Sequence, residues 1–304
     1  MTRSFGQRLH TTIEQRGRLC VGIDPHGFLL DAWGLPRTPA GLREFGLRVV
    51  DAASGTIGIV KPQVAFFEVF GSAGFAALED VLAAARQAGL LVIADAKRGD
   101  IGSSVDAYGD AWLTPGSPLE ADAVTLAAYA GTGSLGGVFD LARQHGKGAF
   151  VLAATSNPES RLVQTALVAA DERADLTVAG LVATEIDEWN RQHAIDGDGD
   201  GNGDRPGDGD TPALGSIGVV LGATKNLLDY GVDVNSLADG APLMPVLAPG
   251  FGHQGALFDD IGSIYGPLAA GTIVSTSRSA LSAGPSALAD TLADQAGQLS
   301  GALS

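Results

Sequence analysis

The chain has 304 residues, of which 45% are hydrophobic and 18% charged, so it is long enough to bury a large apolar core. Its formal net charge of −16 argues against nucleic acid as a partner, because a phosphate backbone attracts a basic surface. No apolar run approaches the roughly 18 residues of a membrane span, and the N-terminus lacks the apolar core of a signal peptide. A single cysteine, Cys20, excludes an intrachain disulfide and any multi-cysteine metal site. We therefore expect a soluble cytoplasmic protein with no membrane partner and a buried thiol.

Helical and strand patterns alternate along the chain. Short apolar runs predict eight buried strands, over residues 19–24, 57–61, 91–97, 121–126, 148–153, 216–221, 243–247 and 271–275. Apolar residues at three- and four-residue spacing predict helices between them, over residues 4–16, 39–52, 73–88, 103–111, 134–145, most of 158–195, and from about 285 onward. Strands that alternate with helices indicate parallel βα units with right-handed crossovers. The count of eight favours a closed barrel, so we predict an α/β fold, a (β/α)8 TIM barrel forming a single domain over residues 1–304.

Capping residues mark several helix boundaries. Thr38 and Pro39 provide an N-cap and a first-turn proline for the second helix. Ser72 is expected to cap the helix before the third strand, and Gly89 to end it.

One segment, residues 196–210, does not fit the barrel pattern. It alternates Gly with Asp and begins as D-x-D-x-D-G, which resembles a calcium-binding loop. Such a loop needs a bidentate Glu at its twelfth position, where this chain has Gly207 or Gly209, depending on the register. The low-complexity composition instead predicts a flexible surface insertion with weak or no calcium binding.

The third strand leads into the densest group of charges. In the stretch from Leu91 to Ile101, an apolar run ends in Asp95, Lys97 and Asp100. Side chains alternate along a strand, so Asp95 and Lys97 point to the same side of it. A structural ion pair at the rim of the core would explain this one pair equally well.

Charges at the ends of neighbouring strands make a functional cluster the better explanation. The first strand ends in Asp24 and the second in Lys61, next to the charged end of the third. Buried ion pairs contribute little net stability, so stability alone does not account for three charged strand ends in succession. In barrels, the carboxyl ends of the strands carry the chemistry.

A second group follows the last two strands. Residues 249–255 form a Gly-rich turn after the seventh strand, and Arg278 follows the eighth. In β/α barrels these two loops frequently bind phosphate through backbone N–H groups and a cation. The arginine fork can hold phosphate oxygens bidentately.

These motifs together resemble those of the orotidine 5′-monophosphate decarboxylases. The block D-A-K-R-G-D-I-G over residues 95–102 resembles the family's D-x-K-x-x-D-I signature, in the form of its longer bacterial and archaeal members. Further blocks resemble the family's in the same order: G-I-D-P over 22–25, V-K-P-Q over 60–63, T-S-N-P over 155–158, A-P-G-F-G-H-Q over 248–254, and S-R over 277–278. The resemblance covers about residues 18–280.

The resemblance implies a homodimeric enzyme that converts orotidine 5′-monophosphate to uridine 5′-monophosphate, the last step of de novo pyrimidine nucleotide synthesis, without metal or organic cofactor. It implies a catalytic tetrad of Lys61, Asp95, Lys97 and Asp100. Lys97 would donate a proton to C6 of the pyrimidine. Asp100 would complete the site of the neighbouring subunit.

The resemblance also implies the residues that bind the substrate. They are Asp24 and Lys61 for the ribose hydroxyls, Ser156 for the pyrimidine edge, Gln254 and Arg278 for the phosphate, Pro249 as a further substrate-binding residue, and Ile101 and Ser104 beside Asp100. The sequence departs from the commonest family pattern at two positions. Ser104 stands where Thr is frequent, and Ser277 stands where Gly is frequent.

Two other interpretations remain open from the sequence. A phosphosugar-processing barrel, such as a 3-keto-gulonate phosphate decarboxylase or a hexulose phosphate synthase, would use magnesium and commonly a Glu near the D-x-K motif. Here that motif continues with Arg98, Gly99 and Asp100, which disfavours this class. A non-catalytic nucleotide-binding barrel would not need to bury carboxylates near an anionic ligand.

Overall fold

The computed structural model describes residues 3–169, 171–195 and 213–303. The predicted insertion at 196–210 therefore lies outside the described residues. Where the chain is described, it contains no helix long and apolar enough to cross a membrane.

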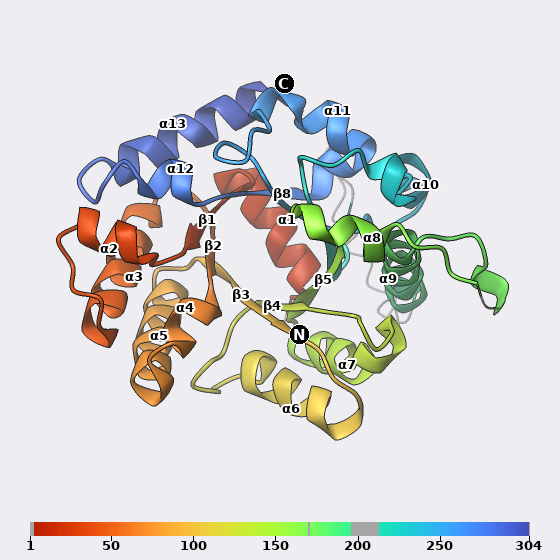
Figure 1. The fold of residues 1–304 in the computed structure, drawn as a ribbon, viewed down its shortest axis with the longest axis horizontal. Helices are drawn as coiled ribbons and strands as arrows, with labels where there is room; N and C mark the ends of the chain where they lie inside the picture. The colour runs from red at the N-terminus through yellow and green to blue at the C-terminus, as the bar shows by residue number, and fades with distance from the viewer. Residues whose placement is uncertain (1–2, 170, 196–212, 304) are drawn as a thin grey trace.

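Eight parallel strands form one closed barrel in the order β1 to β8 (Figure 1). They are β1 Leu19–Ile23, β2 Ile59–Pro62, β3 Leu91–Arg98, β4 Ala123–Leu126, β5 Gly148–Ala154, β6 Ile217–Leu221, β7 Val246–Pro249 and β8 Thr272–Thr276. The barrel closes where β1 pairs with β8, with Val21 opposite Thr276. The predicted α/β fold, a (β/α)8 TIM barrel, is confirmed.

Helices surround the barrel (Figure 1). The α-helices are α1 Phe5–Arg16, α2 Gly27–Ala32, α3 Pro39–Ala53, α4 Val64–Glu68, α5 Gly71–Gln87, α6 Gly102–Leu113, α7 Gly136–His145, α8 Arg161–Gln164, α9 Val178–Ile195, α10 Val234–Ala238, α11 Ile261–Tyr265, α12 Arg278–Leu281 and α13 Leu288–Gly301. Short 3-10 helices cover 132–135, 158–160, 171–173, 227–230, 258–260 and 266–271. The short helices α2 and α4, absent from the sequence prediction, follow β1 and β2 directly.

Two local predictions need correction, and one is confirmed. Thr38 caps α3 as expected, its hydroxyl accepting from the Gly41 N–H at 3.3 Å. Ser72 does not cap α5, because that helix already begins at Gly71 and Phe70 holds the N-cap position without a side-chain hydrogen bond.

The segment 158–177 is also less helical than predicted. After the single turn of α8 the chain forms an antiparallel bridge between Leu167 and Thr177, and α9 begins only at Val178. The apolar side chains of Leu162 and Leu167 are exposed, so their spacing does not mark a buried helical face.

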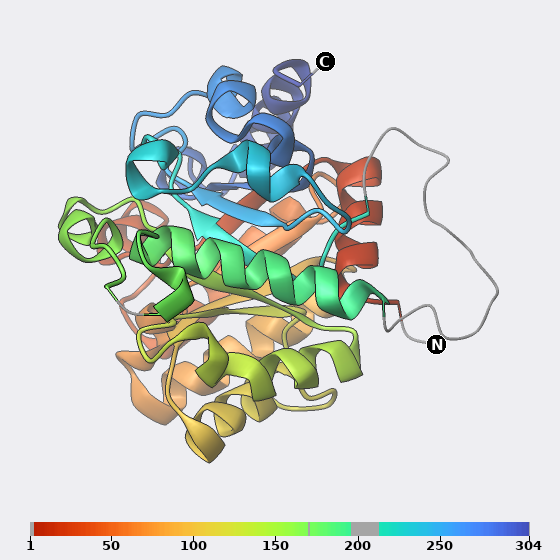
Figure 2. The same cartoon turned by 90° about the vertical axis from the view of Figure 1, so that its right-hand side faces the viewer.

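Helix α1 closes the amino-terminal end of the barrel (Figure 2). Phe5 is fully buried and meets the Phe150 ring edge-on, with 5.9 Å between ring centroids. The Gly6 N–H donates to the Ser216 hydroxyl at 3.2 Å, and a Cβ at Gly6 would lie only 2.0 Å from the Leu214 carbonyl oxygen. A glycine is therefore required where the helix meets β6. The loops after the strands lie at the opposite end, where chemistry is expected.

Candidate active site

Three charged side chains meet at the carboxyl ends of β2 and β3. Lys61 Nζ lies 2.7 Å from Asp95 Oδ2, and Lys97 Nζ lies 2.5 Å from Asp95 Oδ1. Lys61 and Asp95 are buried, whereas the side chain of Lys97 is 44% exposed. One carboxylate is thus held between two ammonium groups, and Lys97 is the cation that faces solvent.

The pairing keeps both buried groups of this array charged. Burial by itself raises the pKa of Asp95, but the charges of Lys61 and Lys97 outweigh it and hold the pKa well below its usual range. Burial likewise lowers the pKa of Lys61, and the opposing charges of Asp95 and Asp24 outweigh it, so that the pKa of Lys61 is raised. The array is therefore a fixed set of charges at neutral pH.

Thr125 on β4 joins the array to the backbone. Its buried hydroxyl accepts from the Lys97 N–H at 2.9 Å and donates to Asp95 Oδ1 at 3.0 Å. Lys97 has φ +48°, a left-handed conformation that is uncommon for a residue with a side chain. The register between β3 and β4 shifts between Ala94 and Arg98, around this residue. Sequence reasoning missed Thr125, because a threonine within an apolar strand carries no distinguishing spacing.

Gln63, next to Pro62 at the end of β2, also contacts the array. Its Oε1 lies 3.3 Å from Lys97 Nζ. With the amide turned over, its nitrogen donates to Asp95 Oδ2 at 3.2 Å and to the Asp95 carbonyl at 2.8 Å. Either orientation adds a neutral polar contact between the second and third strands.

Asp100 lies apart from these three residues in the single chain. It is exposed, and its Oδ1 accepts from the Ile101 N–H at 2.9 Å. It forms no ion pair with any cation of the described residues. Ile101 and Ser104, at the start of α6, are exposed as well. The structure therefore brings together Lys61, Asp95 and Lys97, and leaves this second group on the surface.

Asp24 follows β1 and lies beside the end of β8. The Ser277 hydroxyl donates to its Oδ2 in a short hydrogen bond. Its Oδ1 is buried and has no hydrogen-bond partner among the described residues. Arg278, the first residue of α12, is partly buried. Both charges act on the nearby His26, whose pKa is lowered mainly by burial; Asp24 opposes this shift and Arg278 adds to it.

The remaining predicted binding residues lie in the loops after β5 and β7. Ser156 packs against Gly222, where a Cβ would lie 2.9 Å from the Ser156 Cα. The Pro249 carbonyl accepts from the Ala223 N–H at 2.8 Å. Gln254 is exposed in the turn that follows, where Gly250 has φ +117°. The turn needs glycine at this position to adopt its conformation.

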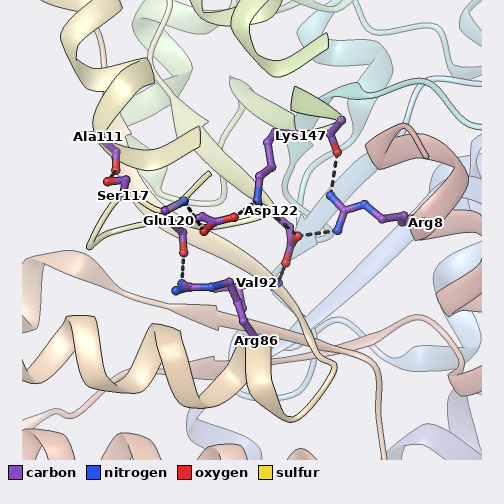
Figure 3. Close-up of polar contacts among 10 residues, drawn as sticks. Arg8, Arg86, Val92, Ala111, Ser117, Glu120, Asp122 and Lys147 are labelled. Atoms are coloured by element: carbon purple, nitrogen blue, oxygen red, sulfur yellow. Dashed lines mark hydrogen bonds and ion pairs between the residues drawn. The ribbon is translucent and has the colours of Figure 1, made fainter. Parts of the chain in front are cut away.

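A second charged network lies at the amino-terminal end of the strands, beside a cavity of about 360 Å³ (Figure 3). Asp122 pairs with Arg8 at 2.5 Å and accepts from the Val92 N–H at 2.9 Å. Lys147 pairs with Glu120 at 2.7 Å, and Arg8 donates to the Gly146 carbonyl at 2.8 Å. Asp122 and Glu120 are each paired with a cation, and these ion pairs join α1 to the start of β4.

Comparisons with known proteins identify the family of this chain. Residues 17–283 match the family described as "Orotidine 5′-phosphate decarboxylase / HUMPS family". The chain belongs to this family. It is 45% identical over 287 residues to orotidine 5′-phosphate decarboxylase of Corynebacterium efficiens, covering 94% of this chain and 92% of that one. It is 46% identical over 286 residues to the enzyme of the same name from Salinispora tropica, with coverage of 94% and 92%.

A solved structure leads to the same family. A Streptomyces avermitilis protein, assigned provisionally as an orotidine 5′-phosphate decarboxylase, superposes with a TM-score of 0.83 at 40% identity, covering 99% of this chain and 96% of that one. The family expected from the sequence, that of a carboxy-lyase, is therefore confirmed. Within the described ranges, no three His, Cys, Asp or Glu side chains are grouped as a metal would require.

Proposed function

We propose that this chain is a cytoplasmic, single-domain enzyme that decarboxylates orotidine 5′-monophosphate to uridine 5′-monophosphate, the last step of de novo pyrimidine nucleotide synthesis. The observation that carries the proposal is the array of Lys61, Asp95 and Lys97 at the carboxyl ends of neighbouring barrel strands. The relatives at about 45% identity, named for this activity, support it.

The chemistry requires a fixed cation beside the reacting carbon. Loss of CO2 from C6 of a uracil ring leaves an electron pair with no good resonance acceptor. The protein must stabilise this charge electrostatically or protonate the carbon as it forms. Lys97 is suited to both roles, since its ammonium group is held at 2.5 Å by Asp95 and still reaches solvent. We therefore assign it as the proton donor to C6.

The carboxylates would also act on the substrate before the reaction. Asp95, together with Asp100 from a second subunit, would lie near the carboxylate that is lost. Like charges in a desolvated site raise the free energy of the bound substrate, and departure of CO2 relieves this repulsion. Lys61 keeps Asp95 charged for this role.

Contacts remote from C6 would supply the binding energy. We propose that Gln254 and Arg278 bind the phosphate, Asp24 and Lys61 the ribose hydroxyls, and Ser156 the pyrimidine edge, with Pro249 also among the substrate-binding residues. These residues lie at or just after the carboxyl ends of β7, β8, β1, β2 and β5, so they belong to one end of the barrel. Binding at a distant phosphate can drive orientation at the reacting centre, and loss of these contacts is therefore expected to lower the rate as well as the affinity.

We further propose that the enzyme is a homodimer whose sites are shared. Asp100, Ile101 and Ser104 would enter the site of the neighbouring subunit. Ile101 is 64% exposed and Tyr129, in the loop after β4, is 97% exposed. A dimer interface would remove such exposed apolar side chains from water.

Loss of the orotidine absorbance band during incubation with orotidine 5′-monophosphate tests the activity. The wild-type protein should turn the substrate over, and Lys97→Ala should lose nearly all turnover while keeping its fold by circular dichroism. Arg43→Ala, which removes a surface cation that pairs with Asp80, serves as the control and should match wild type. Near-normal turnover by Lys97→Ala would contradict the proton-donor assignment.

The same assay distinguishes the magnesium-dependent alternative. The proposed mechanism uses no metal or organic cofactor, so the rate should be unchanged in excess EDTA. A rate that EDTA removes and magnesium restores would contradict the metal-free mechanism. A protein that leaves orotidine 5′-monophosphate unchanged but acts on a phosphosugar with magnesium would be the alternative enzyme.

A further inference from the structure

Ser277 is the one described side chain that hydrogen-bonds to the Asp24 carboxylate. Its hydroxyl donates to Asp24 Oδ2, while Oδ1 is buried without a partner among the described residues. A buried carboxylate oxygen without a donor is costly, so its retention points to a ligand that supplies one.

The surrounding backbone fixes this arrangement. β1 and β8 are paired, with Val21 opposite Thr276, so the residues that follow the two strands lie side by side. At Gly22 a Cβ would lie 3.0 and 3.1 Å from the two carboxylate oxygens of Asp24 and 3.1 Å from the Ser277 Cβ. The carboxylate is thus confined between the β1 backbone and the Ser277 side chain.

We propose that Ser277 is a positioning residue that orients Asp24 for a single hydroxyl of the ligand. The serine occupies Oδ2 and fixes the carboxylate rotamer, and Oδ1 is left to accept one hydrogen bond. This inference rests on the proposed function, which makes the ligand a nucleotide and the hydroxyl one of its ribose. Recognition of a hydroxyl by a buried acceptor discriminates strongly against analogues that lack it.

The hydrogen bond between Ser277 and Asp24 also connects two parts of the proposed binding site, because of where Ser277 lies in the chain. Ser277 immediately precedes Arg278, the proposed phosphate ligand, and holds the N-cap position of α12. The hydrogen bond therefore ties the ribose-binding acid to the phosphate-binding loop. A ligand that carries both a phosphate and a ribose hydroxyl would find the two groups already placed, which lowers the entropic cost of binding.

Binding of two nucleotides to the full-length protein tests this role. Uridine 5′-monophosphate offers both ribose hydroxyls, and 2′,3′-dideoxyuridine 5′-monophosphate offers neither. Ser277→Ala should weaken binding of uridine 5′-monophosphate by about tenfold, the order expected for one hydrogen bond to a charged group. Binding of the dideoxy nucleotide should stay within about twofold of wild type. The ratio of the two dissociation constants therefore reports on the contacts to the ribose hydroxyls, which we assign to Asp24 and Lys61. Ser282→Ala, at the exposed end of the same helix, is the matched control and should change neither.

A double-mutant cycle with Asp24→Asn distinguishes an effect of Ser277 on the orientation of Asp24 from a general effect on folding. In that background Ser277→Ala should no longer change the ratio of the two dissociation constants, because its effect acts through the carboxylate. If Ser277→Ala weakens the binding of both nucleotides equally, or the binding of neither, the inference is overturned while the proposed function stays intact. If the wild-type protein neither binds uridine 5′-monophosphate nor decarboxylates its precursor, the proposed function itself fails.

Discussion

Lys97 adopts a backbone conformation that a side chain disfavours, and it does so at the centre of the proposed site. A left-handed residue with a Cβ costs roughly 1–2 kcal/mol. The structure offsets this cost with the hydrogen bond from the Lys97 N–H to Thr125 and with the ion pair to Asp95. Strain held in this way at a cluster of charges is typical of functional sites. The unusual φ of +48° is therefore an independent sign that the position of this ammonium matters.

Replacing Thr125 with valine tests how far the placement of the Lys97 ammonium depends on the Thr125 hydroxyl. Thr125→Val keeps the shape but removes one acceptor and one donor, so Lys97 N–H and Asp95 Oδ1 each lose a partner. We expect kcat to fall by about tenfold or more with a smaller change in KM, and stability to fall by about 1–3 kcal/mol.

Thr272→Val is the matched control for this substitution. Thr272 is equally buried on β8, but its hydroxyl bonds the Leu268 carbonyl at 2.9 Å, away from the charged array. It should lose similar stability in denaturant unfolding without a change in kcat. An unchanged kcat in Thr125→Val would show that the hydroxyl is structural only.

The charged array also sets a pH dependence. Asp95 has a lowered pKa, so its contribution to stability is present above the unfolded-state value near 3.9 and is lost as the pH falls further. Lys61 has a raised pKa, so its contribution is present below about 10.4 and is lost as the pH rises through the folded value. Asp95→Asn should therefore cost a constant free energy of unfolding, about 3 kcal/mol or more, from pH 5 to 7, where Lys61 stays charged in both proteins. Urea unfolding at several pH values measures it, and a cost that shrinks within this range would contradict the assignment.

The residues of the array could be predicted from sequence, but their supports could not. Lys61, Asp95 and Lys97 each end an apolar run, and parallel strands bring such ends together. Ser277 departed from a family pattern, yet its bond to Asp24 depends on the pairing of β1 with β8, which no local pattern contains. Thr125 was missed for the same reason, since its contacts join strands that are separate in sequence.

At the scale of elements, patterns long enough to repeat were predicted and short ones were not. All eight strands overlap the apolar runs that predicted them, although β7 begins at Val246, three residues later than predicted, and α9 occupies only the second part of its predicted range. Helices α2 and α4 span 6 and 5 residues, too few to show a helical period. Ser72 failed as a cap because α5 is positioned by packing, with Gly74 so close to the Phe67 carbonyl oxygen that a Cβ there would lie 1.8 Å away.

Helix α1 gives an element-scale prediction, because it closes the end of the barrel opposite the site. Phe5→Ala should remove a fully buried ring that packs on Phe150 and destabilise the protein by about 3–5 kcal/mol. Because α1 lies far from the charged array along the barrel axis, kcat and KM of the folded protein should stay close to wild type. Glu14→Ala, on the exposed face of the same helix, should change stability by less than about 0.5 kcal/mol. Thermal unfolding and steady-state kinetics on the same samples check both, and a lost kcat in folded Phe5→Ala would contradict this division of the barrel.

At the scale of the whole molecule, the single chain holds three of the four residues of the proposed tetrad in contact. Asp100 lies on the surface beside exposed apolar residues, with no cation to balance it among the described residues. No sequence pattern reveals an intermolecular contact, so this part of the site came from the family resemblance alone. The proposed tetrad is therefore complete only with a second subunit.

Mixing two inactive variants tests that dependence most directly. Lys97→Ala and Asp100→Ala should each be inactive as pure dimers. In an equal mixture after subunit exchange, about half of the dimers are hybrids, and each hybrid has one intact site and one doubly altered site. We predict recovery of roughly a quarter of the wild-type rate of orotidine 5′-monophosphate decarboxylation. No recovery, with hybrid dimers demonstrated by mass spectrometry, would contradict a site shared between subunits.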